Sequence, residues 1–137
     1  MSKLNAVAGD KKKTQRATVI VEVDGGILLA MDHHGFYLLP GGKIDRGELP
    51  IAAAARELFE ETRLRAYALE LLFEHKSDAN HHHVFRARAN GEMKASDDAK
   101  TLAIFKGSVA ESSLNLSYGT RDILKTLESH TTAASLI

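Results

Sequence analysis

The stretch GGKIDRGELPIAAAARELFEETRL, from Gly41 to Leu64, is the most informative part of this chain. It opens with a glycine pair directly after Pro40, which predicts the end of a strand and a loop over Pro40–Gly42. Pro50 suits the first turn of a helix, where a missing N–H group costs no hydrogen bond. The alanine run Ala52–Ala55 adds helix propensity. The sequence therefore predicts a glycine loop followed by a helix that begins near Pro50.

This helix is expected to have one apolar face and one acidic face. The apolar stripe at helical spacing consists of Ile51, Ala54, Ala55, Leu58 and Thr62. Glu57, Glu60 and Glu61 fall within about 100° of one another on the other side. Like charges at these spacings repel, and the C-terminal half of a helix disfavours anions. The acidic face is either a solvated surface or a site for a divalent cation, which takes carboxylate oxygens as ligands.

Apolar runs on both sides of this stretch are typical of β-strands. They cover residues 17–23, 27–32, 36–40, 66–75, 81–89 and 102–105. A final helix is predicted within residues 112–130. Because one helix lies between strands in the sequence, the pattern predicts a mixed sheet with helices packed on it, which is an α/β (α+β) fold.

The composition is typical of a globular domain, with 137 residues of which 44% are hydrophobic. Lys+Arg and Asp+Glu balance at 18 each, whereas a nucleic-acid-binding protein usually has a basic excess. The absence of cysteine excludes disulfides and thiolate metal sites. The sequence shows no membrane-length apolar run and no signal-peptide core, so a cytoplasmic protein is expected.

A single domain is expected over residues 16–130. Residues 1–15 are polar and include the run Lys11–Lys13, which predicts a flexible N-terminal arm, or alternatively an arm that attracts phosphate. Residues 131–137 are predicted to be a frayed C-terminal tail.

The stretch from Gly41 to Leu64 resembles the Nudix box, the signature of Nudix hydrolases. The signature is Gly, five residues, Glu, seven residues, Arg-Glu, an aliphatic residue, any residue, Glu-Glu, any residue, Gly and an aliphatic residue. The matching positions are Gly42, Glu48, Arg56, Glu57, Leu58, Glu60, Glu61 and Leu64. Arg63 stands where the signature has glycine, which would suit a left-handed helix cap. Either the helix continues further, or Arg63 tolerates that backbone conformation.

The resemblance implies a fold and a reaction class. Nudix proteins form an α/β/α sandwich with a mixed sheet, and they hydrolyse a nucleoside diphosphate linked to a further group. Water attacks a phosphorus atom with the help of Mg²⁺ or Mn²⁺. The small size is similar to that of MutT-like nucleoside triphosphate pyrophosphatases. A small-molecule nucleotide substrate and a monomer or homodimer are therefore expected, with no membrane association and with nucleic acid an unlikely partner.

Roles for individual residues follow from the same resemblance. Glu57 and Glu61 would be metal ligands, and Glu60 a ligand or the general base. The backbone carbonyl of Gly41 could complete the ligand set. Arg56 would hold Glu57 in place. Glu48 would be a structural residue or an acid in the outer shell of the site.

Other candidate residues are less constrained by the pattern. Gly42 and Lys43 could contact a phosphate, and Asn115 could read a base or instead cap the last helix. A distal carboxylate ligand could come from Glu92, Asp97 or Asp98. On a strand, His82 would face opposite to His81 and His83, which leaves metal binding by the pair, an exposed surface or substrate lining as alternatives.

Other functions remain possible from sequence. A non-catalytic Nudix nucleotide sensor is one alternative, although all the glutamates of the box are present. An RNA 5′-end pyrophosphohydrolase is another, but a zero net charge provides little attraction for RNA. A structural domain with a solvated acidic helix is the third.

Overall fold

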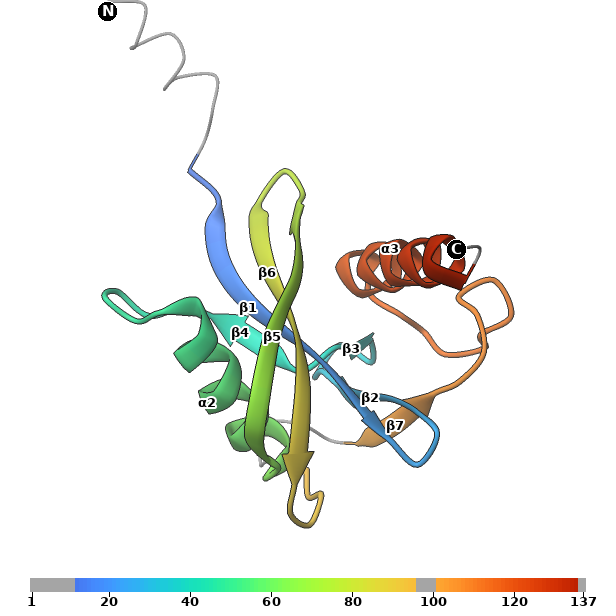
Figure 1. Cartoon of the computed structure of the whole chain (residues 1–137), viewed down its shortest axis with the longest axis horizontal. Coiled ribbons are helices and arrows are strands. Elements are labelled where there is room, and N and C mark those ends of the chain that lie inside the picture. Colours follow the sequence, from blue (N-terminus) through green and yellow to red (C-terminus); the bar gives the residue numbers. More distant parts are fainter. Residues whose placement is uncertain (1–11, 96–100, 136–137) are drawn as a thin grey trace, which may run out of the picture.

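The computed structural model describes the backbone of residues 12–95 and 101–135, and the side chains of residues 12–95 and 101–130. The elements in this part of the chain are β1 (Thr14–Val23), β2 (Gly26–Met31), β3 (Tyr37–Leu38), β4 (Gly41–Lys43), α2 (Pro50–Thr62), β5 (Arg65–Lys76), β6 (Asn80–Asn90), β7 (Leu102–Phe105) and α3 (Tyr118–Ser135). Figure 1 shows α2 and α3 on either side of the sheet. The arm predicted for residues 1–15 lies outside the described residues up to residue 11, and β1 begins inside it at Thr14.

Strand β1 organises the sheet. It pairs antiparallel with β2 and β4 and parallel with β6, in the order β3-β2-β1-β6-β5, while β7 pairs with β2. One parallel pair among antiparallel pairs makes the sheet mixed, as the sequence predicted. A parallel pair needs a long crossover connection. In this chain the crossover between β1 and β6 includes β2 to β5 and the helix α2.

Each face of the sheet packs on a different helix. Successive side chains of a strand point to opposite faces. Val19 belongs to the same buried cluster as Leu58 of α2, whereas its neighbour Ile20 belongs to a second buried cluster with Ile123 and Leu124 of α3. The predicted α/β/α arrangement is therefore confirmed.

The predicted loop over Pro40–Gly42 was wrong in one respect. Gly41 and Gly42 form the start of β4, because they pair with Thr18 and Ala17 of β1. A Cβ atom on Gly41 would collide with the Ala17 carbonyl oxygen, and the φ angle of Gly41 is +154°. This close approach of two backbones requires glycine.

Helix α2 uses a slightly different buried face from the one predicted. Ala54, Leu58 and Thr62 are buried as expected, and Ala53 joins them. Ile51 was expected to be buried but is 45% exposed, because it lies in the first turn, before the part of the helix that packs on the sheet. Ala55, also expected in the stripe, is only partly buried.

Helix α2 does not continue past the position where the signature has glycine. Arg63 adopts the left-handed conformation, with φ 68° and ψ 4°, and its N–H group donates to the Phe59 carbonyl at 2.8 Å. The helix therefore ends where a glycine would end it, and Arg63 tolerates the backbone strain. Its guanidinium lies 5.2 Å from the centroid of the Phe59 ring.

Asn115 does not cap helix α3, as had been considered from the sequence. Ser117 is the cap, since its hydroxyl oxygen accepts from the Thr120 N–H group at 3.2 Å. Asn115 lies earlier, where its side-chain amide donates to the Gly35 carbonyl at 3.3 Å. Helix α3 continues to Ser135, into the stretch predicted as a tail. Within the described part of the chain, no helix is long and apolar enough to cross a membrane.

Candidate active site

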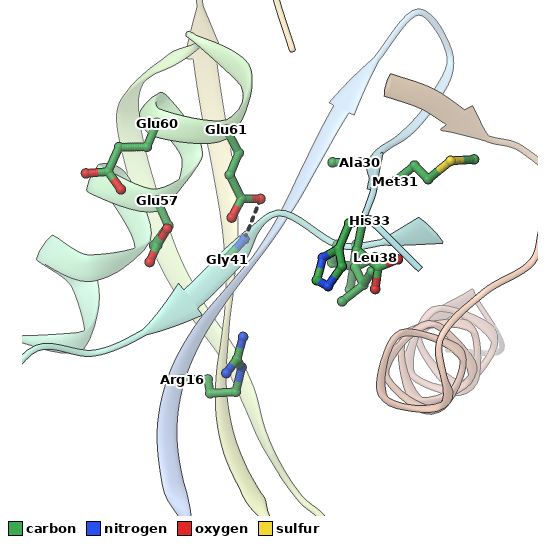
Figure 2. A pocket seen from close by; sticks show the side chains of 11 residues that line it. Arg16, Ala30, Met31, His33, Leu38, Gly41, Glu57, Glu60 and Glu61 are labelled. Atoms are coloured by element: carbon green, nitrogen blue, oxygen red, sulfur yellow. Dashed lines mark hydrogen bonds between the residues drawn. The ribbon is translucent and has the colours of Figure 1, made fainter. Parts of the chain in front are cut away.

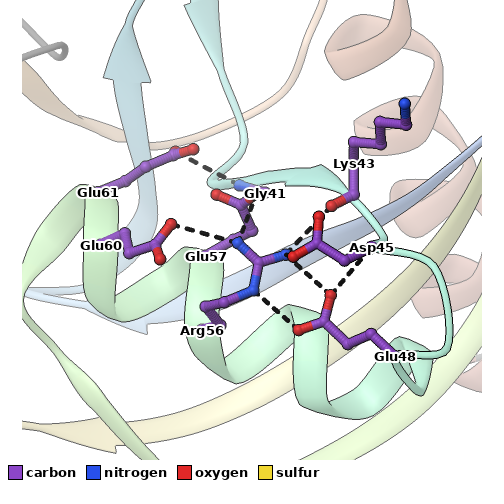
Figure 3. A network of polar contacts seen from close by, with 8 residues as sticks. All are labelled: Gly41, Lys43, Asp45, Glu48, Arg56, Glu57, Glu60 and Glu61. Atoms are coloured by element: carbon purple, nitrogen blue, oxygen red, sulfur yellow. Dashed lines mark hydrogen bonds and ion pairs between the residues drawn. The ribbon is translucent and has the colours of Figure 1, made fainter.

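Arg56 is the centre of a polar network at the start of the site (Figure 3). Its Nε and Nη2 groups donate to both oxygens of Glu48, at 2.8 and 2.9 Å. Its Nη1 group donates to Glu57 and to Glu60, each at 3.3 Å, and Nη2 also reaches the Lys43 carbonyl at 3.2 Å. The guanidinium therefore links the loop before α2 to Glu57 and Glu60, two of the three acids on the polar face of this helix.

Glu48 is fixed in this network from two sides. The Arg56 guanidinium and then the Asp45 N–H group lower the pKa of Glu48 to about 2. The hydrogen bond from Asp45 also closes the turn that precedes the helix, at 2.9 Å. Glu48 is thus a permanently charged partner of Arg56 at neutral pH.

The remaining acids of α2 differ in their exposure. Glu61 is largely buried, and burial together with the charge of Glu57 raises its pKa to about 7. Burial also raises the pKa of Glu57, while Arg56 opposes the shift. Glu60 is more open, with a side chain that is 53% exposed. Two of the three carboxylates are therefore held in positions where their negative charge is poorly compensated.

The glycines of β4 allow the acids to approach the sheet. The Gly41 N–H group donates to Glu61 at 3.4 Å. A Cβ atom on Gly42 would collide with the Glu57 carboxylate, so only glycine leaves that carboxylate its place. The glycine pair and the acidic helix face, which are about 15 to 20 residues apart in the sequence, form one surface.

This surface lines a cavity of about 340 Å³ (Figure 2). The lining residues are Arg16, Ala30, Met31, Asp32, His33, Leu38, Leu39, Gly41, Glu57, Glu60 and Glu61. Figure 2 shows the three glutamates projecting from one helix along one side of the cavity, with Arg16 and His33 on other sides. The cavity thus combines an acidic wall with a cationic side chain from β1.

A second cavity of about 290 Å³ adjoins the first and shares Arg16, Leu38, Leu39 and Gly41 with it. Its other lining residues are Thr18, Gly42, Asn80, His82, Ser117, Gly119, Thr120 and Ile123. A hydrogen bond of 2.8 Å joins Nδ1 of His82 to the Thr18 hydroxyl group. Burial lowers the pKa of His82 to about 4, so this ring is neutral at pH 7.

The structure brings together some of the residues predicted from sequence and separates others. Gly41, Glu57, Glu60 and Glu61 line the first cavity and Gly42 the second, with Arg56 and Glu48 directly behind the acids. Lys43 contributes its backbone carbonyl to Arg56, and neither its side chain nor Asn115 lines either cavity. Glu92 is exposed and lines neither of them. The other candidate distal ligands, Asp97 and Asp98, lie outside the described residues.

Sequence reasoning missed Arg16, His33, Leu38 and Leu39. Arg16 begins the run of β-branched residues in β1, and no local pattern distinguishes it from any surface arginine. It lies opposite the acids only because β4 pairs with β1, with Arg16 opposite Lys43. That pairing joins residues far apart in sequence, so no local signal could have identified it.

The donor set of the site fits a hard divalent cation. Glu57, Glu60 and Glu61 offer carboxylate oxygens, which are the ligands that Mg²⁺ and Mn²⁺ prefer. The raised pKa values of Glu57 and Glu61 mean that the protein's own groups compensate their charge poorly. A bound cation would supply the missing positive charge.

Comparisons with known proteins agree with this geometry. The NUDIX domain family matches residues 12–125. The chain is 34% identical to a solved structure of a protein from Chromobacterium violaceum assigned to the nudix hydrolase family, covering 87% of this chain and 79% of that chain with a TM-score of 0.80. No match was found among curated proteins.

Two further solved structures are similar. A MutT NUDIX hydrolase from Burkholderia pseudomallei is 26% identical, with 84% of this chain and 98% of that chain covered and a TM-score of 0.71. The ORF135 protein of E. coli is 25% identical, with 91% and 95% covered and a TM-score of 0.75. The family match over most of the chain, together with the acid-lined cavity, shows that the chain belongs to the Nudix family, as a MutT-like Nudix pyrophosphohydrolase.

Proposed function

We propose that the protein is a nucleoside triphosphate pyrophosphatase that depends on Mg²⁺ or Mn²⁺. Water attacks a phosphorus of the triphosphate, one phosphoanhydride bond breaks, and the products are a nucleoside monophosphate and pyrophosphate. The protein would act on free nucleotides in the cytoplasm, as a monomer or a homodimer.

The observation that carries this proposal is the acidic wall of the first cavity. Glu57, Glu60 and Glu61 line it together, and Arg16 lines the same space. A triphosphate is multiply anionic, so it can share a site with carboxylates only when cations lie between them. A bound Mg²⁺ or Mn²⁺ would polarise a phosphoryl oxygen and lower the pKa of the attacking water.

The two adjoining cavities support a nucleoside as the other part of the substrate. Leu38 and Leu39 line both cavities, and Ile123 adds an apolar wall to the second. Arg16 lies at their boundary, where it could contact a phosphate of a substrate that spans both. A base would then lie in the second cavity, near the neutral ring of His82.

The proposed roles of the acids follow their exposure. Glu57 and Glu61 are assigned as metal ligands, because they are the acids with raised pKa values and so gain most from a cation. Glu60 is more exposed and is assigned as a further ligand or as the general base that takes a proton from water. The carbonyl of Gly41 is a candidate for completing the ligand set.

The surrounding residues position these acids. Arg56 bonds to both Glu57 and Glu60, and Glu48 holds Arg56. Lys43 and Gly42 remain candidates for contacting phosphate. Asn115, which lines neither cavity, is retained only as a candidate base-reading residue.

A substrate panel tests the proposal. It contains nucleoside triphosphates, ADP-ribose, dinucleoside polyphosphates, nucleotide sugars and a 5′-triphosphorylated RNA, each assayed with Mg²⁺, with Mn²⁺ and with chelator. We expect pyrophosphate release from nucleoside triphosphates with metal and none with chelator. Glu61→Gln serves as the impaired control.

Each other outcome has a defined meaning. Preference for another compound of the panel would retain a Nudix hydrolase but overturn the triphosphate assignment. Binding of nucleotide without product release from any compound would favour a nucleotide sensor. Full activity in the presence of chelator would overturn the metal dependence.

A further inference from the structure

Glu74, His81 and His83 form a second cluster of potential metal ligands, here called the histidine cluster, which shares no residue with the acidic wall. Each of the three offers one ligand atom, and these atoms lie within 4.8 Å of one another. Glu74 of β5 lies opposite His83 of β6 in the strand register. His81 is two residues before His83, so both rings project from the same face of the sheet.

The proton on His83 is fixed by its neighbour on β1. His83 Nε2 lies 2.8 Å from the carbonyl oxygen Oε1 of Gln15, which can only accept a hydrogen bond. A neutral ring with its proton on Nε2 has a free lone pair on Nδ1. That lone pair faces Glu74, with 4.0 Å between Nδ1 and Oε1.

In the neutral ring, Nδ1 and the Glu74 oxygen both carry lone pairs, and they lie 4.0 Å apart. This arrangement is not a hydrogen bond, and it is the arrangement that a cation would join. His81 stacks on His83 with 4.4 Å between ring centroids and an interplanar angle of 20°, which orders both rings. His81 also bonds to the same Glu74 oxygen through Nε2, and a metal would replace the proton of that bond.

We propose that the histidine cluster binds a divalent cation of borderline hardness, with Zn²⁺ as the first candidate. Two imidazole nitrogens and one carboxylate oxygen are a common ligand set for zinc, with water completing the coordination. Ligand atoms at about 2.1 Å from a tetrahedral ion lie roughly 3.4 Å apart, so the three groups need to converge by about 1 Å. The side chain of Glu74 is 47% exposed and is free to make this movement.

The two sites would select different ions. The acidic wall offers only oxygens and favours Mg²⁺ or Mn²⁺, whereas the histidine cluster offers nitrogen and favours Zn²⁺. In the sheet, Ala17 of β1 lies between His83 of β6 and Gly42 of β4. His83 and Gly42, the glycine that faces Glu57, are therefore about two strand spacings apart, roughly 10 Å along the sheet.

An ion at the histidine cluster would join β5 to β6, next to a hydrogen bond that ties β6 to β1. Glu74 belongs to β5 and the two histidines to β6, while Gln15 ties His83 to β1. Figure 1 shows these three strands running together at the end that carries the β5–β6 turn. We expect zinc to raise the thermal unfolding temperature, because it binds the folded chain in preference to the unfolded one.

Zinc titration of the full chain by calorimetry, in excess Mg²⁺, tests the proposal. We expect His83→Ala to weaken zinc binding at least tenfold, and Glu74→Ala to weaken it as well. The matched control is His34→Ala, an exposed histidine outside the cluster, which should bind zinc within twofold of the unchanged protein. Glu61→Gln should also remain within twofold. Circular dichroism without zinc checks that each variant is folded.

The NMR signals of the imidazole rings report where zinc binds, independently of the measured affinity. Zinc should shift the ring signals of His81 and His83 and leave those of His34 in place. The proposal is overturned if His83→Ala and Glu74→Ala bind zinc as tightly as His34→Ala does. It is also overturned if Glu61→Gln abolishes zinc binding, which would place the ion on the acidic wall.

Discussion

Glu48 and Arg56 form a two-pronged ion pair, with Nε–Oε2 and Nη2–Oε1 distances of 2.8 and 2.9 Å. Paired hydrogen bonds of this kind fix the plane of a guanidinium. The free edge of that plane then points to Glu57 and Glu60. A glutamate outside the cavity thus controls the position of two carboxylates that line it.

This relationship predicts a functional role for Glu48. We expect Glu48→Gln to raise the Mg²⁺ concentration needed for half-maximal activity by about 10- to 100-fold, as is typical when a residue behind a metal ligand is lost. Asp45→Asn is the matched control, because Asp45 reaches Arg56 only at 3.5 Å and is 68% exposed. Equal effects of the two substitutions would contradict the prediction.

Glu57 is predicted to be essential for turnover. Glu57→Gln removes a charge from the cavity wall and is expected to lower kcat at least about 100-fold, the range for loss of a group that acts in the chemical step. Glu70→Gln, an exposed glutamate on β5, is the control for a change of charge alone. A loss below tenfold in Glu57→Gln would refute the assigned role.

The buried carboxyl of Glu61 predicts a dependence of stability on pH in metal-free protein. Its pKa is raised from 4.5 to about 7 in the folded chain. Folding is therefore favoured by the protonated form below pH 4.5, and this contribution is lost as the pH rises to about 7. Glu61→Gln should escape this loss, which is on the order of 3 kcal/mol in the free energy of unfolding.

Urea unfolding with chelator at pH 4.5 and pH 8 measures the difference. The lowered pKa of His82 acts in the opposite direction. The unfolded chain takes up a proton at this residue below about pH 6.5, whereas the folded chain does so only near pH 4, so stability falls between these values. This contribution is present in both proteins and cancels. Adding Mg²⁺ at pH 8 should remove most of the gap between wild type and Glu61→Gln. A pH profile shared by the two proteins would show that Glu61 is not held at this pKa.

Substitutions of Arg63 are expected to change the free energy of unfolding but not kcat. Left-handed backbone costs a non-glycine residue about 1 kcal/mol, so Arg63→Gly should be about 1 kcal/mol more stable than Arg63→Ala. Arg63→Ala should itself be about 0.5 kcal/mol less stable than wild type, because the contact of the guanidinium with the Phe59 ring is lost. Unfolding in urea measures both changes, and kcat should stay within twofold. A Gly variant no more stable than the Ala variant would contradict the cap assignment.

The parts of the fold that could be predicted are those specified by neighbouring residues. The strands follow runs such as Thr18–Val23, and α2 follows its alanines and Pro50. The exposure of Ile51 could not be predicted, because helical spacing does not indicate where along its length a helix meets the sheet. The strand at Gly41–Lys43 was also missed, since its hydrogen bonds come from β1.

The residues of the candidate site also fall into those that neighbouring sequence predicts and those that it does not. Glu57, Glu60 and Glu61 share a helix face, so their spacing alone brings them together. Arg16 and His82 reach the two cavities through strand pairings that no local pattern specifies. Asn115 was placed near the base by its position in the sequence alone, and its side-chain amide donates to the Gly35 carbonyl.

The parallel pairing of β1 with β6 has a consequence for the order of folding. Thr14 pairs with Asn80, so the central strand of the sheet finds this neighbour only among residues far along the chain. Contacts of such high sequence separation slow folding, because a long loop must close before they form. While the chain emerges from the ribosome, the β6-facing edge of β1 stays open until β6 has been synthesised. The hydrophobic run at Val19–Val21 is then the segment that a chaperone would be expected to shield.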